Sequence, residues 1–487
     1  MNTIFFLILG FLTSLLFPPY FFLPLGFIIF PSICWFIDKN FQKLSIIYTF
    51  KCIFGYAFIF LLSFLFWIQN PFYEIEETKN IFFVSFLLIL LLAFIFSVIF
   101  IFILKINKRV PVVILIPIIF VIIEYLISNL LYGFPWLTFS LIISSVDYFS
   151  FFFKYFGTFI SSYITLQIFC LPYFFVKNGI SKIKFNYYLT FILLPIIIIL
   201  VLNFKYDNKD LLKKEELELE IFQLNFKSQA IDNYNEEKFE KIIQNIKSSN
   251  SKLMIFAENN YPYLVDDFTL PRIQSILKKD QIVIIGATRL SDNSYFNTLL
   301  NISSDEIKYF DKKILVPFGE FLPFRKFLFF LSPIAGSNDF SKGKNKRIIK
   351  VDQTFNYIPV ICYEIIFYWK LINSINFKSN LLINITNDIW FGKYLGPYQH
   401  FYLSKIRAAE FNKVLIRVSN NGISGIINEN GRILSTLNLN ETGSIKYKIK
   451  LNDNKNLYQT HYFLKLYFFA MLIILIVINF FQRNDSK

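Results

Sequence analysis

The side chain in this sequence best suited to covalent chemistry is the thiol of Cys362. The other three cysteines lie in long apolar stretches, whereas Cys362 ends the strand-like run 358–362 and is closely followed by Glu364. A thiol has a pKa of about 8.5 and must lose its proton before it acts as a nucleophile. The chain holds only two histidines, His400 and His461, so the base that removes this proton need not be a histidine.

Two charged residues of complementary chemistry accompany other strand-like runs. Glu258 follows the run 253–257, and Lys312 follows residues 309–311. Active sites of open α/β sheets lie where strands end. A carboxylate at such a place can take the proton of the thiol, and an ammonium can stabilise a thiolate or an oxyanion. Taken singly, each has a plainer interpretation: a loop carboxylate, a solvated lysine, or an inert buried cysteine. Only the three together indicate a covalent enzyme.

Composition indicates a membrane protein. Of the 487 residues 55% are hydrophobic, and the formal net charge is +15. Much of the basic charge falls in short loops between apolar runs, where it sets membrane topology, and no basic helix or aromatic RNA-binding motif accompanies it. We therefore expect no nucleic-acid partner. The sequence has no CxxC pair and no cysteine pattern of a disulfide framework, so we also expect no metal site.

Eight apolar segments are candidate membrane helices, since a spanning helix needs about 20 mainly apolar residues. The first lacks the charged start and clear cleavage site of a signal peptide, so we interpret it as a retained helix. The first two are short and separated by Pro18-Pro19, which leaves a hairpin or a re-entrant pair open. The segments are residues 4–17, 21–37, 46–68, 81–104, 112–127, 149–176, 188–202 and 463–481.

The charge of the loops predicts how these segments are oriented. Lysines and arginines follow the second, fourth, sixth and eighth segments. The loop after the third carries Glu74, Glu76 and Glu77, and the loops after the first and fifth are nearly uncharged. By the positive-inside rule, both termini lie in the cytoplasm, and the chain after the seventh segment lies outside it.

The polar stretch before the last segment has the pattern of an α/β domain. We place it at residues 204–460, between a helical region at 1–203 and a last helix with a short tail at 461–487. After the charged run 209–220, short β-rich runs alternate with polar helical stretches. The expected strands are 219–224, 253–257, 282–287, 297–302, 358–362, 381–386, 415–419 and 425–428, and the expected helices are 238–248, 270–279 and 398–412.

Several motifs resemble those of the apolipoprotein N-acyltransferases, the membrane-anchored branch of the nitrilase superfamily. The resemblance extends over nearly the whole chain, including the domain inserted before the last apolar segment. The motifs are Leu315-Val316-Pro317-Phe318-Gly319-Glu320-Phe321-Leu322-Pro323, Ile361-Cys362-Tyr363-Glu364, Asn387-Asp388-Ile389-Trp390-Phe391-Gly392, Arg407-Ala408-Ala409-Glu410, Asn420-Asn421-Gly422-Ile423 and, in the apolar part, Glu124 and Gly133-Phe134-Pro135-Trp136-Leu137.

The resemblance implies a fold and three catalytic roles. The fold is a multi-pass bundle of about eight membrane helices that carries an extracytoplasmic nitrilase-like domain, an αββα sandwich. Glu258 would be the general base, Lys312 the cation that stabilises the oxyanion, and Cys362 the nucleophile. The implied reaction moves an acyl chain from a membrane phospholipid, through a thioester on Cys362, to the α-amine of a diacylglyceryl apolipoprotein. It requires no cofactor and would take place at the outer face of a bacterial inner membrane.

The resemblance also implies supporting and substrate-contacting residues. Residues that would support the active site are Glu320, Tyr363 and Glu364. Trp390 and Trp136 would contact substrate. Trp136 would line a cleft that opens sideways to lipid. Trp390 also fits a plainer role, as an aromatic residue of the core or of the membrane interface. Two departures concern lipid contacts. The family usually has Trp-Pro-Glu where this chain has Phe256-Ala257-Glu258. The family also commonly has a tryptophan shortly after a motif that corresponds to Gln223-Leu224-Asn225. This chain has Ile231-Asp232 near that position.

Two other functions use the same features. A membrane-tethered nitrilase-like amidohydrolase would use the same three residues, with water as the acceptor. A non-catalytic binding protein built on a degenerate nitrilase-like domain would have lost at least one of the three. All three are present, and the motif around Glu320 together with the apolar segments favours acyl transfer.

Overall fold

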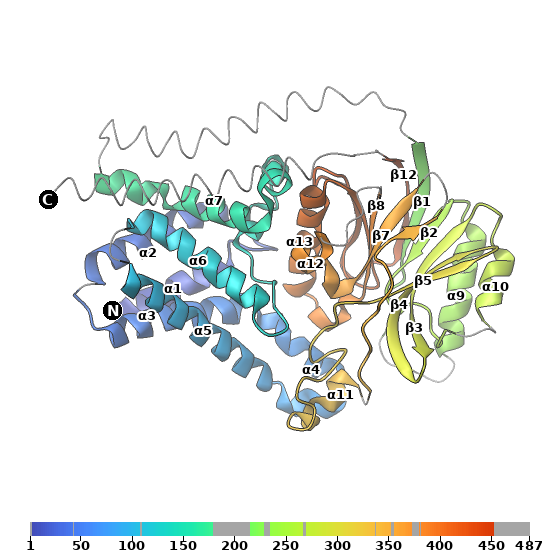
Figure 1. The fold of residues 1–487 in the computed structure, drawn as a ribbon, viewed down its shortest axis with the longest axis horizontal. Coiled ribbons are helices and arrows are strands. Elements are labelled where there is room, and N and C mark those ends of the chain that lie inside the picture. The colour runs from blue at the N-terminus through green and yellow to red at the C-terminus, as the bar shows by residue number, and fades with distance from the viewer. Residues whose placement is uncertain are drawn as a thin grey trace. The chain divides into compact units, whose positions relative to one another are not determined.

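The chain forms two compact units in the computed structural model (Figure 1). The structure describes residues 2–41, 43–107, 110–178, 215–227, 234–265, 269–336, 338–351, 355–372, 379 and 381–451. Among these, residues 2–66 and 87–178 form the helical unit, and residues 67–86 and 215–451 form the sheet unit. The predicted segments 188–202 and 463–481 and the departure at Ile231-Asp232 lie outside the described residues.

The helical unit is built from apolar helices close to the predicted segments. Its longer described helices are α1 (Asn2–Ser14), α2 (Gly26–Asn40), α3 (Ile46–Phe64), α5 (Val84–Ile106), α6 (Val112–Asn129) and α7 (Ser150–Asn178). Within the described part of the chain, α3, α5, α6 and the stretch that contains α7 are long and apolar enough to cross a membrane. Large apolar side chains such as Ile47 and Phe102 are exposed on these helices, as expected where lipid replaces water.

A buried carboxylate organises the chain that follows α6. Glu124 is fully buried and accepts hydrogen bonds from the hydroxyls of Thr138 and Ser162 and from the backbone N–H of Phe139. A charged side chain within a membrane segment is costly unless it is paired. These donors satisfy it, and they hold the turn that carries Trp136 against the helices.

The sheet unit contains two six-stranded sheets. The first has the order β12-β1-β2-β3-β4-β5 and the second the order β11-β10-β9-β8-β7-β6. The first sheet comprises β1 (Glu215–Gln223), β2 (Leu253–Phe256), β3 (Ile282–Ser291), β4 (Ser294–Ser303), β5 (Ile307–Asp311) and β12 (Gly443–Leu451). The second comprises β6 (Ile349–Lys350), β7 (Asn356–Ile361), β8 (Leu381–Thr386), β9 (Val414–Ser419), β10 (Ser424–Ile427) and β11 (Ile433–Leu437).

Helices cover the outer face of each sheet. On the first sheet lie α9 (Tyr234–Ser248) and α10 (Leu270–Ile276); α12 (Tyr368–Ile372) and α13 (Gly396–Phe411) lie beside the second (Figure 1). The buried face of α9 carries apolar residues at helical spacing, Phe239, Ile242, Ile243 and Ile246, which pack on Met254, Val283 and their neighbours. The four layers, helix–sheet–sheet–helix, confirm the predicted αββα sandwich.

The strands that carry the candidate residues end at corresponding edges. In the first sheet β1, β2 and β3 are mutually parallel, and β5, two antiparallel pairings away from β3, runs the same way. In the second sheet β7, β8 and β9 are mutually parallel. Glu258 follows β2, Lys312 follows β5 and Cys362 follows β7, so the strand directions bring their ends together.

One segment from the apolar half of the sequence packs in the sheet unit. Residues 67–86, which connect α3 to α5 and include α4 (Asn70–Glu74), belong to this unit. Trp67 Nε1 donates to Gln399 Oε1 at 2.9 Å, and Asn70 Nδ2 donates to the Phe391 carbonyl at 3.0 Å. Phe72 packs with Leu322 and Leu331 in a small apolar cluster. The sequence predicted no role of this kind for the loop after the third segment.

Candidate active site

Glu258 is held in a tight turn after β2. Its side chain is nearly buried, and its Oε2 accepts the backbone N–H of Asn387 at 2.8 Å. Its Oε1 accepts the amide of Asn297 at 2.7 Å. The neighbouring strand approaches closely because it carries Gly286: a Cβ there would lie 2.5 Å from the Cα of Glu258. Glycine at this position therefore permits the turn that presents the carboxylate.

Lys312 lies between two carboxylates. Its side chain is 1% exposed, and its Nζ lies 2.9 Å from Glu320 Oε1 and 3.5 Å from Glu258 Oε1. Asn297 Nδ2 also donates to Glu320 Oε1 at 2.7 Å, and the other oxygen of Glu320 accepts the backbone N–H of Val316 at 2.8 Å. One ammonium and one amide thus hold both carboxylates in place, and Glu320 fixes Lys312.

Cys362 occupies a strained turn directly after β7. Its backbone φ is 48°, in the left-handed region, and the residue is 6% exposed. A non-glycine residue in a sparsely populated region costs about 1–3 kcal/mol and persists where its surroundings enforce it, often at functional sites. The thiol makes a hydrogen bond with Glu258. The predicted nucleophile and the predicted base are therefore in direct contact.

Glu364 ties the Cys362 turn to the loop that follows Lys312. Its carboxylate accepts the backbone N–H groups of Ile361 at 3.0 Å, Lys313 at 2.8 Å and Ile314 at 3.1 Å. Arg347 donates to both of its oxygens, at 2.6 and 2.7 Å. The carboxylate is fully buried, and Arg347 and Ile361 are buried beside it. Glu364 thus acts on the geometry of both the thiol and the ammonium.

Burial and neighbouring charges set the protonation of the three central groups. Burial, together with the charge of Glu258, raises the pKa of the Cys362 thiol, and Lys312 opposes that rise. Burial also raises the pKa of Glu258, with Lys312 lowering it and Glu320 raising it. Burial alone would lower the pKa of Lys312, but the carboxylates of Glu320 and Glu258 raise it above its ordinary value. The lysine is therefore a cation, and the proton rests on the thiol.

The aromatic residues predicted around the site differ in their surroundings. Tyr363 is buried beside Cys362 and packs edge-on against Phe367, with ring centroids 5.0 Å apart. Trp390 is partly exposed in the loop after β8. Trp136 is 0% exposed within the helical unit, where its ring stacks on Phe134. The structure places Trp136 in a core rather than on an accessible wall, and substrate contact by either tryptophan stays a prediction.

Sequence reasoning missed several residues that shape this site. Asn297 lies in mid-strand, and Arg347 lies in a run of basic residues, so neither position carried a signal. Asn387 and Asp388 were visible only as part of a motif. His400 faces the backbone of Cys362, which spacing along the chain does not reveal. In the described residues, no group of three or more His, Cys, Asp or Glu side chains is arranged to hold a metal ion.

Comparisons with known proteins match both units. Residues 9–171 match the apolipoprotein N-acyltransferase N-terminal domain, and residues 221–459 match the carbon–nitrogen hydrolase family. The apolipoprotein N-acyltransferase of Rhizobium etli is 37% identical over 206 residues, 40% of this chain and 38% of that relative. That of Rickettsia typhi is 38% identical over 174 residues, 34% of each chain. The chain thus spans well under half the length of these relatives.

Solved structures also align with the chain. Saccharomyces cerevisiae Nit3, a member of branch 10 of the nitrilase superfamily, aligns over 48% of this chain and 90% of that chain, with a TM-score of 0.38 and 16% identity. The family matches are more informative, because one falls on the apolar helices and the other on the sheets and their strand-end residues. The chain therefore resembles the apolipoprotein N-acyltransferases in both parts, with their N-terminal domain matched at residues 9–171 and a carbon–nitrogen hydrolase domain at residues 221–459.

Proposed function

We propose that this protein transfers a fatty acyl chain from a membrane phospholipid to the α-amine of a diacylglyceryl apolipoprotein. The observation that carries the proposal is the convergence of the Cys362 thiol, the Glu258 carboxylate and the Lys312 ammonium in one buried cluster. Support also comes from the family matches and from the apolar helices, because donor and acceptor both reside in a bilayer.

In the first half-reaction, Glu258 removes the proton of the Cys362 thiol as sulfur attacks the ester carbonyl of the phospholipid. The carbon–sulfur bond forms, and the carbonyl oxygen becomes an oxyanion that the ammonium of Lys312 stabilises. The ester carbon–oxygen bond then breaks. The leaving alkoxide takes the proton from Glu258, which releases a lysophospholipid and leaves a thioester on Cys362.

In the second half-reaction, the α-amine of the lipoprotein attacks the thioester carbonyl. Glu258 takes a proton from the amine as the carbon–nitrogen bond forms, and Lys312 again stabilises the oxyanion. The carbon–sulfur bond breaks, the thiolate recovers a proton from Glu258, and the amide leaves. Glu320, Tyr363 and Glu364 hold the reacting groups without entering either step, and Trp390 contacts substrate beside the site.

The loop charges support a location for this chemistry. We place both termini in the cytoplasm and the sheet unit outside it, at the outer face of a bacterial inner membrane. Mature acceptors and outer-leaflet phospholipids are available there.

The test is acyl transfer by the purified protein in detergent. A phospholipid with a labelled acyl chain is incubated with a diacylglyceryl-cysteine peptide and the wild-type protein, Cys362→Ser, or Cys52→Ala as a matched control in a buried apolar position. Label should move to the peptide amine with the wild type and the control, and not with Cys362→Ser. Release of free fatty acid alone would indicate a hydrolase. Intact phospholipid in the presence of folded protein would indicate a binding protein.

A further inference from the structure

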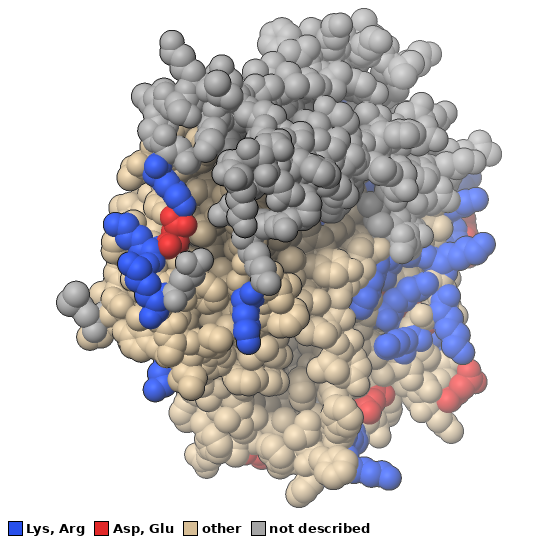
Figure 2. Space-filling view, turned by 60° about the vertical axis from the view of Figure 1, so that its left-hand side comes forward, with Lys and Arg blue, Asp and Glu red and all other residues tan. Residues whose placement is uncertain are grey.

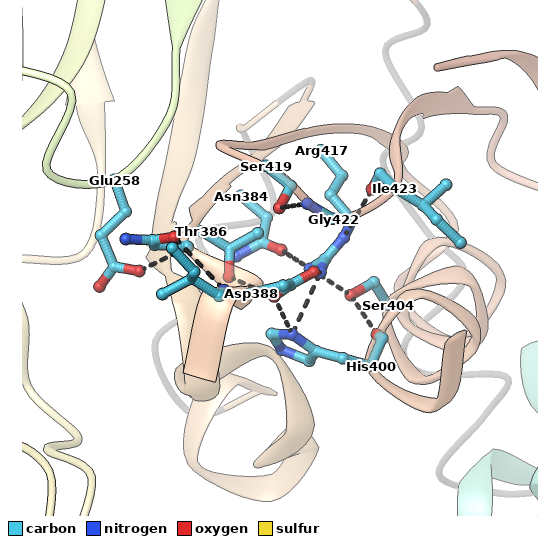
Figure 3. A network of polar contacts seen from close by, with 12 residues as sticks. Glu258, Asn384, Thr386, Asp388, His400, Ser404, Arg417, Ser419, Gly422 and Ile423 are labelled. Carbon is cyan, nitrogen blue, oxygen red and sulfur yellow. Dashed lines mark hydrogen bonds and ion pairs between the residues drawn. The ribbon is translucent and has the colours of Figure 1, made fainter. Parts of the chain in front are cut away.

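Asp388, His400 and Arg417 form a buried cluster of polar contacts that the proposed reaction does not use (Figure 3). Asp388 is at its centre. Its Oδ2 accepts Arg417 Nη2 at 2.7 Å, and its Oδ1 lies 2.8 Å from His400 Nδ1. These three side chains, from the loop after β8, from α13 and from β9, have no exposed surface.

Arg417 holds the cluster in one arrangement. Besides Asp388, its guanidinium donates to Asn384 Oδ1 at 2.6 Å, to Ser404 Oγ at 3.0 Å and to the Ile423 carbonyl at 3.2 Å. The other side of Asp388 is closed by Gly422, where a Cβ would lie 2.1 Å from Asp388 Oδ2. Five donors in a rigid guanidinium fix the carboxylate more firmly than a single point charge would.

Three contacts lead from this cluster to the reacting groups. Thr386 Oγ1 donates to Asp388 Oδ1 at 3.0 Å, and its hydroxyl lies beside the thiol of Cys362. His400 lies on α13, which packs against the turn that begins at Cys362, so the imidazole lies beside the Cys362 backbone. The backbone N–H of Asn387, adjacent to Asp388, donates to Glu258 Oε2 at 2.8 Å. The cluster therefore reaches the nucleophile through Thr386 and α13, and the base through the backbone of Asn387.

We propose that Asp388, His400 and Arg417 form a buried positioning unit that sets the placement of Cys362 relative to Glu258. The inference deepens the proposed function, since it rests on Cys362 as the nucleophile and Glu258 as its base. The unit acts on Cys362, whose backbone has a left-handed conformation and whose thiol must be held against the carboxylate of Glu258. Thr386 links Asp388 to the sulfur of Cys362.

His400 positions the turn and does not act as the base. It meets the backbone of Cys362, whereas the thiol itself meets Glu258. Burial and the nearby Arg417 charge lower the pKa of His400, although Asp388 opposes this shift. Arg417 and His400 hold the pKa of Asp388 far below its ordinary value despite burial. His400 Nδ1 lies 2.8 Å from Asp388 Oδ1 and 3.1 Å from Arg417 Nη2, so both charged partners hold the ring at this one atom.

The test compares variants that remove one contact and keep the shape. Thr386→Val removes the hydroxyl at nearly constant volume, and Thr386→Ser keeps it as the matched control. His400→Asn keeps a donor for Asp388 but is too short to reach Cys362. Two quantities are measured: the rate and pH dependence of iodoacetamide alkylation at Cys362, located by peptide mass, and kcat and KM of acyl transfer.

We expect Thr386→Val and His400→Asn to lower kcat by about 100-fold and to leave KM unchanged. A loss of this size is what a displacement of about 1 Å at a reacting group causes. Alkylation of Cys362 should slow and its pH dependence should move, while Thr386→Ser behaves as wild type. Folded Thr386→Val protein with wild-type alkylation and kcat would overturn the inference, whether or not His400→Asn folds. Because alkylation needs no lipid, a wild-type protein that alkylates normally but transfers no acyl chain would contradict only the proposed function.

Discussion

Glu258, Lys312 and Cys362 owe their protonation states to burial as much as to one another. Burial favours the neutral thiol and the neutral carboxyl, whereas two carboxylates keep the lysine charged. A thiol that rests protonated needs a base at contact distance, and Glu258 with a raised pKa is a better proton acceptor near neutral pH than an ordinary glutamate. The same carboxylate, once protonated, can return the proton to the leaving group.

The first prediction concerns the acid limb of the pH profile. Glu258 must be ionised to act, so kcat/KM for acyl-enzyme formation should fall as the pH drops through its raised pKa, above the ordinary 4.5. Glu320→Gln removes a negative charge that raises this pKa, so the acid limb should move to lower pH. The measurement is the pH dependence of acylation for both proteins. A limb that moves to higher pH would show that Glu320 does not act on Glu258 through its charge.

A second prediction concerns the buried pair of Glu364 and Arg347. Glu364→Gln leaves the Arg347 charge without its partner, which costs about 3–5 kcal/mol, so thermal unfolding should occur at lower temperature. Adding Arg347→Met should restore part of the lost stability, because it removes the unpaired charge. It should restore little of the activity, because the backbone N–H groups of Ile361 and Lys313 remain without a carboxylate. Equal melting temperatures for the single and double variants would contradict this account.

The pH dependence of that stability has a definite sign. The pKa of Glu364 is lowered, because Arg347 and the backbone donors outweigh the effect of burial. A carboxyl of this kind contributes stability that is fully present above its unfolded pKa, near 4.5, and is lost as the pH falls through the lower folded value. Acid should therefore destabilise the wild-type protein more than the Glu364→Gln variant.

At the scale of elements, the segment 67–86 is joined to two loops of the site. Its Trp67 and Asn70 hold Gln399 and the Phe391 carbonyl, next to the loop whose Asn387 N–H binds Glu258. Its Phe72 packs on Leu322, two residues after Glu320. A connection between two apolar helices thus braces both the base and the residue that fixes the lysine.

This bracing predicts the effect of a mild substitution. Trp67→Phe keeps an aromatic ring against Phe391 but removes the indole donor to Gln399, at a cost of about 1–3 kcal/mol. We expect a lower kcat of acyl transfer with little change in KM. Tyr73→Phe, on an exposed side chain of the same segment, is the control and should be neutral. Equal kcat values for the two variants would show that segment 67–86 does not support the active site.

The elements that sequence patterns located are those with strong local signals. The strands before Glu258 and Cys362 are short and mainly apolar, so their ends predicted where the site lies. The strands β6, β11 and β12 were missed, and of β5 only the end at residues 309–311 was expected. β12 pairs with β1, more than 200 residues away in sequence, and such a pairing leaves no local trace. Asn297 and Arg347 were missed because their partners, Glu258, Glu320 and Glu364, lie in turns that only the folded chain brings to them.

At the scale of the whole molecule, charge is distributed as expected for a membrane protein. On the face drawn in Figure 2, Lys and Arg side chains stand in separate groups and broad areas between them carry no charge. The interpretation of the +15 net charge as a consequence of loop topology, with no nucleic-acid partner, stays a prediction.

The predicted orientation can be tested with single surface cysteines. Asp305→Cys, in the sheet unit, and Lys43→Cys, after α2, are both at exposed positions, whereas the described native cysteines are buried. A membrane-impermeant maleimide should label Asp305→Cys in intact spheroplasts and Lys43→Cys only after lysis. The reverse pattern would place the sheet unit in the cytoplasm.

The most direct test of the central claim is the intact mass of the protein after incubation with phospholipid alone. Without an acceptor, the wild-type protein should gain the mass of one acyl chain, located on the Cys362 peptide and removed by hydroxylamine, as a thioester requires. Cys362→Ser should gain no such hydroxylamine-sensitive group. Lysophospholipid production without a mass increase, or the same labile adduct on Cys362→Ser, would contradict acyl transfer through Cys362.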